Sequence, residues 1–255
     1  MQTQDDIERL RDFLEAIPGE VSQEIASEDA MHAYAPELYF RAGREAVRNI
    51  RLALLAAGTE QVQNVLDFAC GWGRVMRTLK AAFPDARLTA CDIQPGQVDF
   101  CAEAFGATGV YSDVDPAKLR FDDRFDVIWS GSLMTHVDQG RWPGFLRVWE
   151  SHLAEHGVLV FTTYGRFAAQ EMRLGKNLLN LTEEQAEQVL REYDRTGFGF
   201  SHSSVDADTL TDRAWVCRAL DEVPTLELLL YIERGWLGQD VVACTTRGVA
   251  DLWRA

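Results

Sequence analysis

The chain has 255 residues, of which 47% are apolar, and a formal net charge of −15. This length and apolar content fit one large folded domain and argue against a largely disordered chain. The acidic charge argues against a non-specific polyanion binder, because nucleic-acid binding normally needs a basic patch that neutralises phosphates. We therefore expect no nucleic acid among its partners.

The first residues carry neither a basic region nor an apolar stretch of the signal-peptide kind, and no run reaches the roughly 18 apolar residues of a membrane span. The five cysteines are widely spaced and mostly stand in apolar runs, as small buried side chains do in a reducing compartment. They form no CxxC pair of the kind that binds zinc. We expect a cytoplasmic protein with no membrane partner and no bound metal.

Two helical patterns open the chain. An apolar stripe with helical spacing follows Thr3 and ends before Pro18, and a longer pattern runs from about Pro36 to Ala57 and stops before Gly58. Residues 1–58 are therefore predicted to form a helical N-terminal cap.

Strands and helices alternate after this cap. Five strands are predicted, most of them continuous apolar runs of the kind that buried parallel strands require: Asn64 to Ala69, Arg87 to Ile93, Gly109 to Ser112, Phe125 to Gly131, and Val158 to Thr163. Helices are predicted near 74–83, 95–104 and 141–155. This alternation indicates βαβ winding, in which ligands bind at the carboxyl ends of the strands.

The last third departs from simple alternation. It begins with a predicted helical insertion at about 166–204, including a helix from Thr182 to about Arg195, and a further helix is predicted over Asp206 to Leu220. Leu226 to Arg234 and Val241 to Thr246 form two strands whose short link permits only an antiparallel hairpin. Residues 59–255 are thus predicted to be a three-layer, doubly wound α/β domain with a seven-stranded, mostly parallel sheet.

The most informative segment is the glycine turn from Asp67 to Gly73, which follows the first predicted strand. About 20 residues further on, Asp92 ends the second strand, where a carboxylate can accept the hydroxyls of a ribose. The third glycine of a dinucleotide-binding turn is missing, because Met76 stands in its place. A pyrophosphate beside the carboxylate of Asp67 would also be repelled, so a cationic adenosine ligand is favoured.

These residues resemble the class I methyltransferases that use S-adenosylmethionine. The turn is similar to the first motif of that family, with Ala69 where many members have a further glycine, and Asp92 resembles the family's ribose-binding acid. The C-terminal hairpin is also similar to the end of the methyltransferase sheet. The resemblance implies a Rossmann-like fold and S-adenosylmethionine as cofactor.

The resemblance also implies roles in cofactor binding. Gly71 and Gly73 would let the backbone approach the ligand closely, and Asp67 would hold the ammonium of the methionine portion. Asp92 would accept the ribose hydroxyls, and Ile93 would pack on the adenine.

Further contacts are implied at the two ends of the cofactor. Asp113 and the amide of Val114 would meet the adenine, although the same residues also read as an ordinary turn. The carbonyl of Ser130 or of Gly131 would accept from the ammonium. Tyr39 and Arg44 would bind the carboxylate, with a surface helix that serves only packing as the alternative.

His136 is the candidate catalytic residue, because it follows the fourth predicted strand and a neutral imidazole can accept a hydroxyl proton near pH 7. Alternatively, it only organises the loop. Four further side chains are placed near the acceptor by topology: His32, Tyr34, Tyr164 and His202.

The sequence therefore predicts a methyltransferase that acts most readily on a hydroxyl of a small molecule, a glycan or a natural-product intermediate. N-methylation and carboxyl methylation remain open, as does a catalytically inert cofactor-binding or scaffold module. His152 to His156 also matches the H-x-x-E-H zinc motif, a short pattern that leaves a zinc hydrolase as a distant alternative. Neither the acceptor nor the oligomeric state follows from the sequence.

Overall fold

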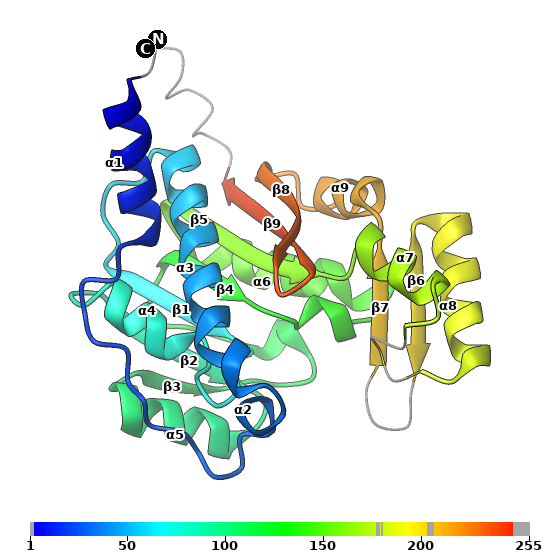
Figure 1. Cartoon of the computed structure of the whole chain (residues 1–255), viewed down its shortest axis with the longest axis horizontal. Helices are drawn as coiled ribbons and strands as arrows, with labels where there is room; N and C mark the ends of the chain where they lie inside the picture. The colour runs from blue at the N-terminus through cyan, green and yellow to red at the C-terminus, as the bar shows by residue number, and fades with distance from the viewer. Residues whose placement is uncertain (1–2, 177–178, 180, 203–206, 247–255) are drawn as a thin grey trace.

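The structure is a computed structural model that describes residues 3–176, 179, 181–202 and 207–246. Within these residues, a seven-stranded sheet has the order β3-β2-β1-β4-β5-β9-β8 (Figure 1). Its strands are β1 (Asn64–Phe68), β2 (Arg87–Asp92), β3 (Thr108–Tyr111), β4 (Phe125–Ser130), β5 (Leu153–Thr163), β8 (Leu226–Trp236) and β9 (Gln239–Thr246). Neighbouring strands are parallel except where β9 pairs with β5 and with β8. The predicted mostly parallel sheet with a C-terminal antiparallel hairpin is confirmed.

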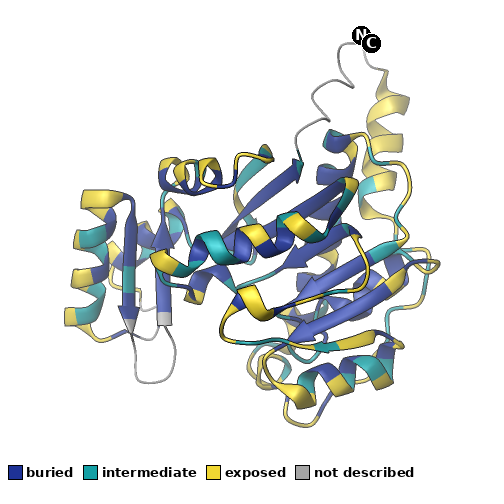
Figure 2. Ribbon diagram, turned by 180° about the vertical axis from the view of Figure 1, so that it is seen from behind, coloured by how far each residue is buried: buried dark blue, intermediate teal, exposed yellow. Residues whose placement is uncertain are grey.

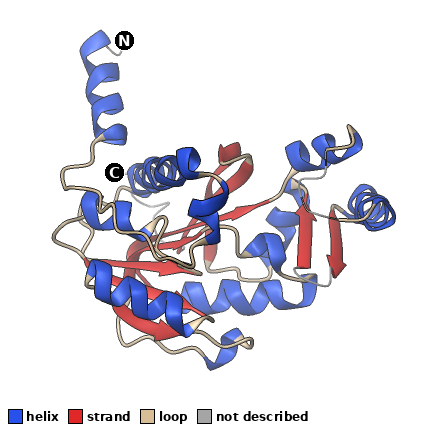
Figure 3. Cartoon of the chain, turned by 60° about the horizontal axis from the view of Figure 1, so that its bottom comes forward, coloured by secondary structure: helices blue, strands red, loops and turns tan. Residues whose placement is uncertain are grey.

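Helices cover both faces of this sheet (Figures 1 and 3). Successive side chains of a strand point to opposite faces. Val65 therefore packs with one set of helices and Leu66 with the other. The first set is α3 (Pro36–Ala57), α4 (Met76–Ala82) and α5 (Pro95–Phe105), and the second is α6 (Trp142–His152) and α9 (Arg213–Asp221). The predicted three-layer architecture follows from these two cores.

Helix α3 has the bounds that its sequence predicts. It begins at Pro36, whose missing N–H is one that a first helical turn leaves unpaired, and it ends at Gly58, which adopts a left-handed φ of 69°. Its Ala46 and Ile50 are fully buried against the sheet. This part of the N-terminal cap therefore belongs to the main core.

The helices before α3 are more exposed. The first, α1 (Gln4–Glu15), begins with a reciprocal capping box between Thr3 and Asp6, and α2 (Ala30–Tyr34) follows it. Figure 2 shows α1 as a largely exposed helix, and none of its residues is buried. Among the described helices, none is long and apolar enough to cross a membrane.

The insertion between β5 and α9 contains more than helices. Its elements are α7 (Arg166–Arg173), α8 (Glu183–Thr196), β6 (Phe198–His202) and β7 (Ala207–Thr211), and the last two form a separate antiparallel sheet. The helix predicted from Asp206 was wrong over 207–211, which form β7. The helix begins later because Asp212 is its N-cap and accepts a hydrogen bond from the amide of Trp215 at 2.6 Å.

One other boundary differs from the prediction. Strand β5 begins at Leu153 rather than Val158, so the helix predicted over 141–155 ends at His152. Leu153 is buried and pairs with Phe125 of β4, and burial in the sheet overrides its helical propensity. Three short 3₁₀ helices complete the described elements: η1 (Pro116–Lys118), η2 (Met134–His136) and η3 (Gln139–Arg141).

Candidate active site

A cavity of about 1250 Å³ opens at the carboxyl ends of β1, β4 and β5. Its wall combines the glycine turn after β1, the loop after β4, the insertion and the turn between β8 and β9. Ligands of doubly wound sheets bind at this edge. The volume exceeds the roughly 300–1,000 Å³ of most small-molecule sites, so a cofactor and an acceptor can lie side by side.

The two glycines of the turn have different structural roles. Gly71 has a left-handed φ of 52°, and a side chain there would enter open space at the cavity. Gly73 also has a positive φ, but a Cβ there would lie 2.3 Å from the ring of Phe105, so its glycine allows α5 to pack closely. Ala69 adopts φ 63°, a conformation that glycine adopts more easily.

Asp67 lies at the cavity as a buried carboxylate with one oxygen, Oδ2, that has no hydrogen-bond partner. Burial and, second, the charge of Asp92 raise its pKa from 3.8 to about 7. An orphaned buried oxygen of this kind fits a cationic donor, because an ammonium supplies both the hydrogen bond and the opposite charge. The site therefore fits the methionine end of S-adenosylmethionine.

Asp92 braces the turn from the end of β2. Its Oδ2 accepts from the amide of Gly71 at 2.9 Å and its Oδ1 from the amide of Gln94 at 3.0 Å. The carboxylate does not line the cavity, so its contact with a ribose stays a prediction. Ile93 is 49% exposed beside it and keeps an apolar surface for an adenine.

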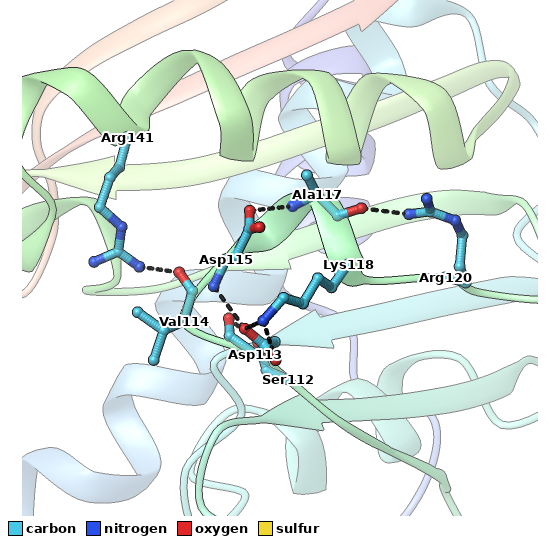
Figure 4. Close-up of polar contacts among 8 residues, drawn as sticks. All are labelled: Ser112, Asp113, Val114, Asp115, Ala117, Lys118, Arg120 and Arg141. Carbon is cyan, nitrogen blue, oxygen red and sulfur yellow. Dashed lines mark hydrogen bonds and ion pairs between the residues drawn. The ribbon is translucent and has the colours of Figure 1, made fainter.

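The two residues predicted to contact the adenine, Asp113 and Val114, do not line the cavity. Their polar contacts are drawn in Figure 4. Asp113 accepts from the amide of Asp115 at 2.9 Å and forms an ion pair with Lys118 at 3.1 Å. These two contacts, the amide first, lower its pKa. The carbonyl of Val114 accepts from Arg141 at 2.5 Å. An adenine amino group would compete with Lys118 for the carboxylate.

Of the two residues predicted to bind the carboxylate of the cofactor, one lines the cavity and the other does not. Tyr39 is buried at the cavity, where its hydroxyl donates to the carboxylate of Asp29 and accepts from Arg77 at 3.2 Å. Burial raises the pKa of this tyrosine. Arg44 is exposed and lies outside the cavity wall.

Arg74 is a cavity residue that sequence reasoning missed, although it directly follows Gly73. Its guanidinium lies over the ring of Trp236 at 5.1 Å. Burial lowers the pKa of Arg74, and its guanidinium forms no hydrogen bond or ion pair with another described residue. Such a guanidinium can bind a carboxylate in the cavity.

The loop after β4 brings His136 to the wall of the cavity. Its side chain is 44% exposed, and Nδ1 lies 3.7 Å from Oδ1 of Asp208 on β7. The amide of Ser132, which has a left-handed φ of 63°, donates to Thr162 at 2.8 Å and fixes the start of this loop. Ser130 is fully buried, and its hydroxyl has no partner among the described residues.

Of the four side chains predicted near the acceptor, two line the cavity. Tyr164 and Tyr34 line the cavity, and burial raises the pKa of Tyr164. His32 lies outside the wall, with its ring edge-on to Tyr39 at 5.1 Å. The side chain of His202 is outside the described part of the chain.

The H-x-x-E-H segment does not form a metal-binding cluster in the described residues, where no group of three or more His, Cys, Asp or Glu side chains could hold an ion. Nδ1 of His152 lies 2.8 Å from the carbonyl of Val148, and the imidazole of His156 lies 3.9 Å from Glu155. The two histidines therefore have separate environments.

Known proteins share part of this sequence and this fold. A family model described as a methyltransferase domain matches residues 65–157, which include the glycine turn and His136. Over these residues the chain is similar to a methyltransferase domain, as the resemblance of the glycine turn to the class I S-adenosylmethionine-dependent methyltransferases implies. S-adenosylmethionine is the cofactor of this family, in agreement with the cofactor inferred from Asp67 and the glycine turn.

Individual methyltransferases share part of the sequence or the fold. A malonyl-[acyl-carrier protein] O-methyltransferase of Acetivibrio thermocellus is 28% identical over 126 residues, 49% of this chain and 44% of that protein. A trans-aconitate 2-methyltransferase of Klebsiella pneumoniae is 31% identical over 102 residues, 40% of each chain. The matches thus span less than half the length of these relatives. The crystal structure of an S-adenosylmethionine-dependent methyltransferase from Clostridium acetobutylicum superposes with a TM-score of 0.61 at 13% identity, covering 86% of this chain and 98% of that one.

Proposed function

We propose that this methyltransferase transfers a methyl group from S-adenosylmethionine to a hydroxyl oxygen of a small molecule, glycans and natural-product intermediates included. The observation that carries the proposal is that one cavity is lined both by Asp67, which has a buried carboxylate oxygen without a hydrogen-bond partner, and by His136. The first fits a cationic cofactor and the second fits a hydroxylated acceptor.

In this proposal the residues of the glycine turn hold the cofactor. Asp67 accepts from its ammonium, Arg74 binds its carboxylate, and the open side of Gly71 lets backbone approach the ligand. Asp92 accepts from the ribose and Ile93 packs on the adenine. When bound, the cofactor supplies an electrophilic methyl group on a sulfonium.

His136 then accepts the proton of the acceptor hydroxyl. A positioned general base typically contributes about 10²–10⁴ in rate, and alignment of the reacting atoms contributes more. The imidazole has access to the acceptor because it lines the cavity and is partly exposed.

Carboxyl methylation is a second candidate, favoured by guanidinium groups in the cavity. Besides Arg74, the proposed anchor of the cofactor, Arg234 lines the cavity and forms no ion pair with a described carboxylate. The names of the related proteins, a malonyl-carrier O-methyltransferase and a trans-aconitate methyltransferase, point to acceptors that carry carboxylates. An ionised carboxylate is already nucleophilic, so this reaction would not need His136 as a base.

Calorimetry with S-adenosylmethionine and S-adenosylhomocysteine tests the cofactor site, and absence of binding to both would refute the proposal. Transfer of labelled methyl groups to a panel of monosaccharides, phenols, trans-aconitate and a malonyl thioester then tests the acceptor. Hydroxyl acceptors should lose turnover in His136→Gln, whereas carboxylate acceptors should keep it. A bound cofactor with no product from any acceptor would favour the inert module.

A further inference from the structure

Asp208 is a carboxylate that the insertion places in the cavity beside the loop after β4. It lies on β7, is 5% exposed, and lines the same cavity as Asp67. Its Oδ1 lies 3.7 Å from Nδ1 of His136. The sequence gives no local sign of this pair, because the region of Asp208 is predicted as a helix.

Hydrogen bonds on both sides of the pair fix its geometry. The hydroxyl of Thr209 donates to the carbonyl of Val137, next to His136, at 2.9 Å. On the far end of β7, the amide of Thr211 donates to the carbonyl of Tyr164 at 2.8 Å and so docks the strand on the end of β5. These two contacts hold β7 against the loop of His136 and against the end of β5.

The two partners differ in exposure in a way that favours one arrangement of the imidazole. The side chain of Asp208 is 7% exposed and that of His136 is 44% exposed. A buried carboxylate beside Nδ1 stabilises a hydrogen on that nitrogen, which leaves the lone pair on Nε2. The separation of 3.7 Å is longer than a hydrogen bond, and catalytic hydrogen bonds are often long before the substrate binds.

We infer that Asp208 is the positioning residue of the methyl transfer: it holds His136 in the tautomer with hydrogen on Nδ1 and presents Nε2 to the acceptor. The inference rests on the proposed function, in which His136 is the base. The acceptor O–H proton passes to Nε2 while the oxygen forms its bond to the methyl carbon and the S–CH₃ bond breaks. The carboxylate of Asp208 balances the positive charge that the imidazole then carries.

Nitrogen NMR of the free protein tests the tautomer without any acceptor. In alkaline buffer, where imidazoles are neutral, the His136 signals are identified by their loss in His136→Gln. They should report hydrogen on Nδ1 in the wild type and on Nε2 in Asp208→Asn, because the asparagine amide donates to Nδ1. Asp138→Asn is the matched control, since this acid of the same loop instead accepts from the amide of Gly140 at 3.0 Å. Hydrogen on Nε2 in the wild type, or an unchanged tautomer in Asp208→Asn, would overturn the inference.

Kinetics with a hydroxyl acceptor found in the methyl-transfer panel give the second readout. Asp208→Asn should lower kcat by about 10²-fold or more while the KM for S-adenosylmethionine stays unchanged. Equal kcat in the two proteins would overturn the role of Asp208. A protein that binds the cofactor and shows the Asp208-dependent tautomer, yet methylates nothing, would refute the proposed function and leave the positioning contact intact.

Discussion

Replacing Asp67 by asparagine should remove a loss of stability that the wild type shows between about pH 5 and about pH 8, and it should weaken cofactor binding. The pKa of this buried carboxyl is raised from 3.8 to about 7, so the folded chain keeps a proton that the unfolded chain loses. The free energy of unfolding therefore falls as the pH rises from 3.8 to about 7. The reason is that the ionised carboxylate is buried and its Oδ2 has no hydrogen-bond partner.

The size of the effect follows from proton linkage. We compare about pH 5 with about pH 8. Over roughly two of these pH units, Asp67 is protonated in the folded protein and ionised in the unfolded chain. At 1.36 kcal/mol for each unit, the free energy of unfolding of the wild type should fall by about 2.7 kcal/mol relative to Asp67→Asn. The asparagine amide also changes the free energy of unfolding by an amount that does not depend on pH. This amount cancels, because only the change between the two pH values is compared.

Urea unfolding of both proteins at the two pH values measures this difference. Asp85→Asn, at an exposed surface position, controls for the loss of one negative charge. A difference between wild type and Asp67→Asn that does not change with pH would refute the reasoning. Calorimetry completes the test: affinity for S-adenosylmethionine should rise with pH through about 7 in the wild type and lose that rise in the variant.

Three further substitutions test the geometry of the turn and its surroundings. Ala69→Gly should be neutral or stabilise by about 1 kcal/mol in thermal unfolding, since Ala69 adopts a left-handed φ of 63°, and a clear loss would contradict this reading of its backbone. Gly43→Ala should destabilise by about 1–3 kcal/mol, because the new Cβ would lie 2.0 Å from Oγ1 of Thr78, and adding Thr78→Ala should recover part of the loss. Arg74→Met should weaken binding of S-adenosylmethionine by roughly 10-fold or more without affecting its decarboxylated analogue, and equal losses for both ligands in calorimetry would remove Arg74 as the carboxylate anchor.

The parts of the fold that were predicted correctly are those whose signals are local. Helix α3 carries both its start and its stop in the chain, at Pro36 and Gly58, and the short link between β8 and β9 permits only a hairpin. The apolar runs of the parallel strands likewise identify themselves without knowledge of their neighbours.

The predictions were wrong or incomplete where contacts between residues far apart in the chain determine the structure. Strand β7 has a sequence that also suits a helix, and it becomes a strand because β6 and the end of β5 offer it hydrogen bonds. The cavity pairs Arg74 with Trp236, and His136 with Asp208, across large separations in the chain. Side-chain direction at such contacts cannot be derived from spacing along one sequence.

The insertion between β5 and α9 has a small apolar core of its own, formed by α7, α8 and β7. It contributes Asp208 and other polar groups to the cavity, whereas the glycine turn and Asp67 belong to the main sheet. In the proposed function, the residues that bind the cofactor therefore lie in the main domain, whereas the insertion adds polar side chains beside the acceptor. Under the same proposal, exchange of residues 166–211 among relatives would change the acceptor and keep the methyl donor.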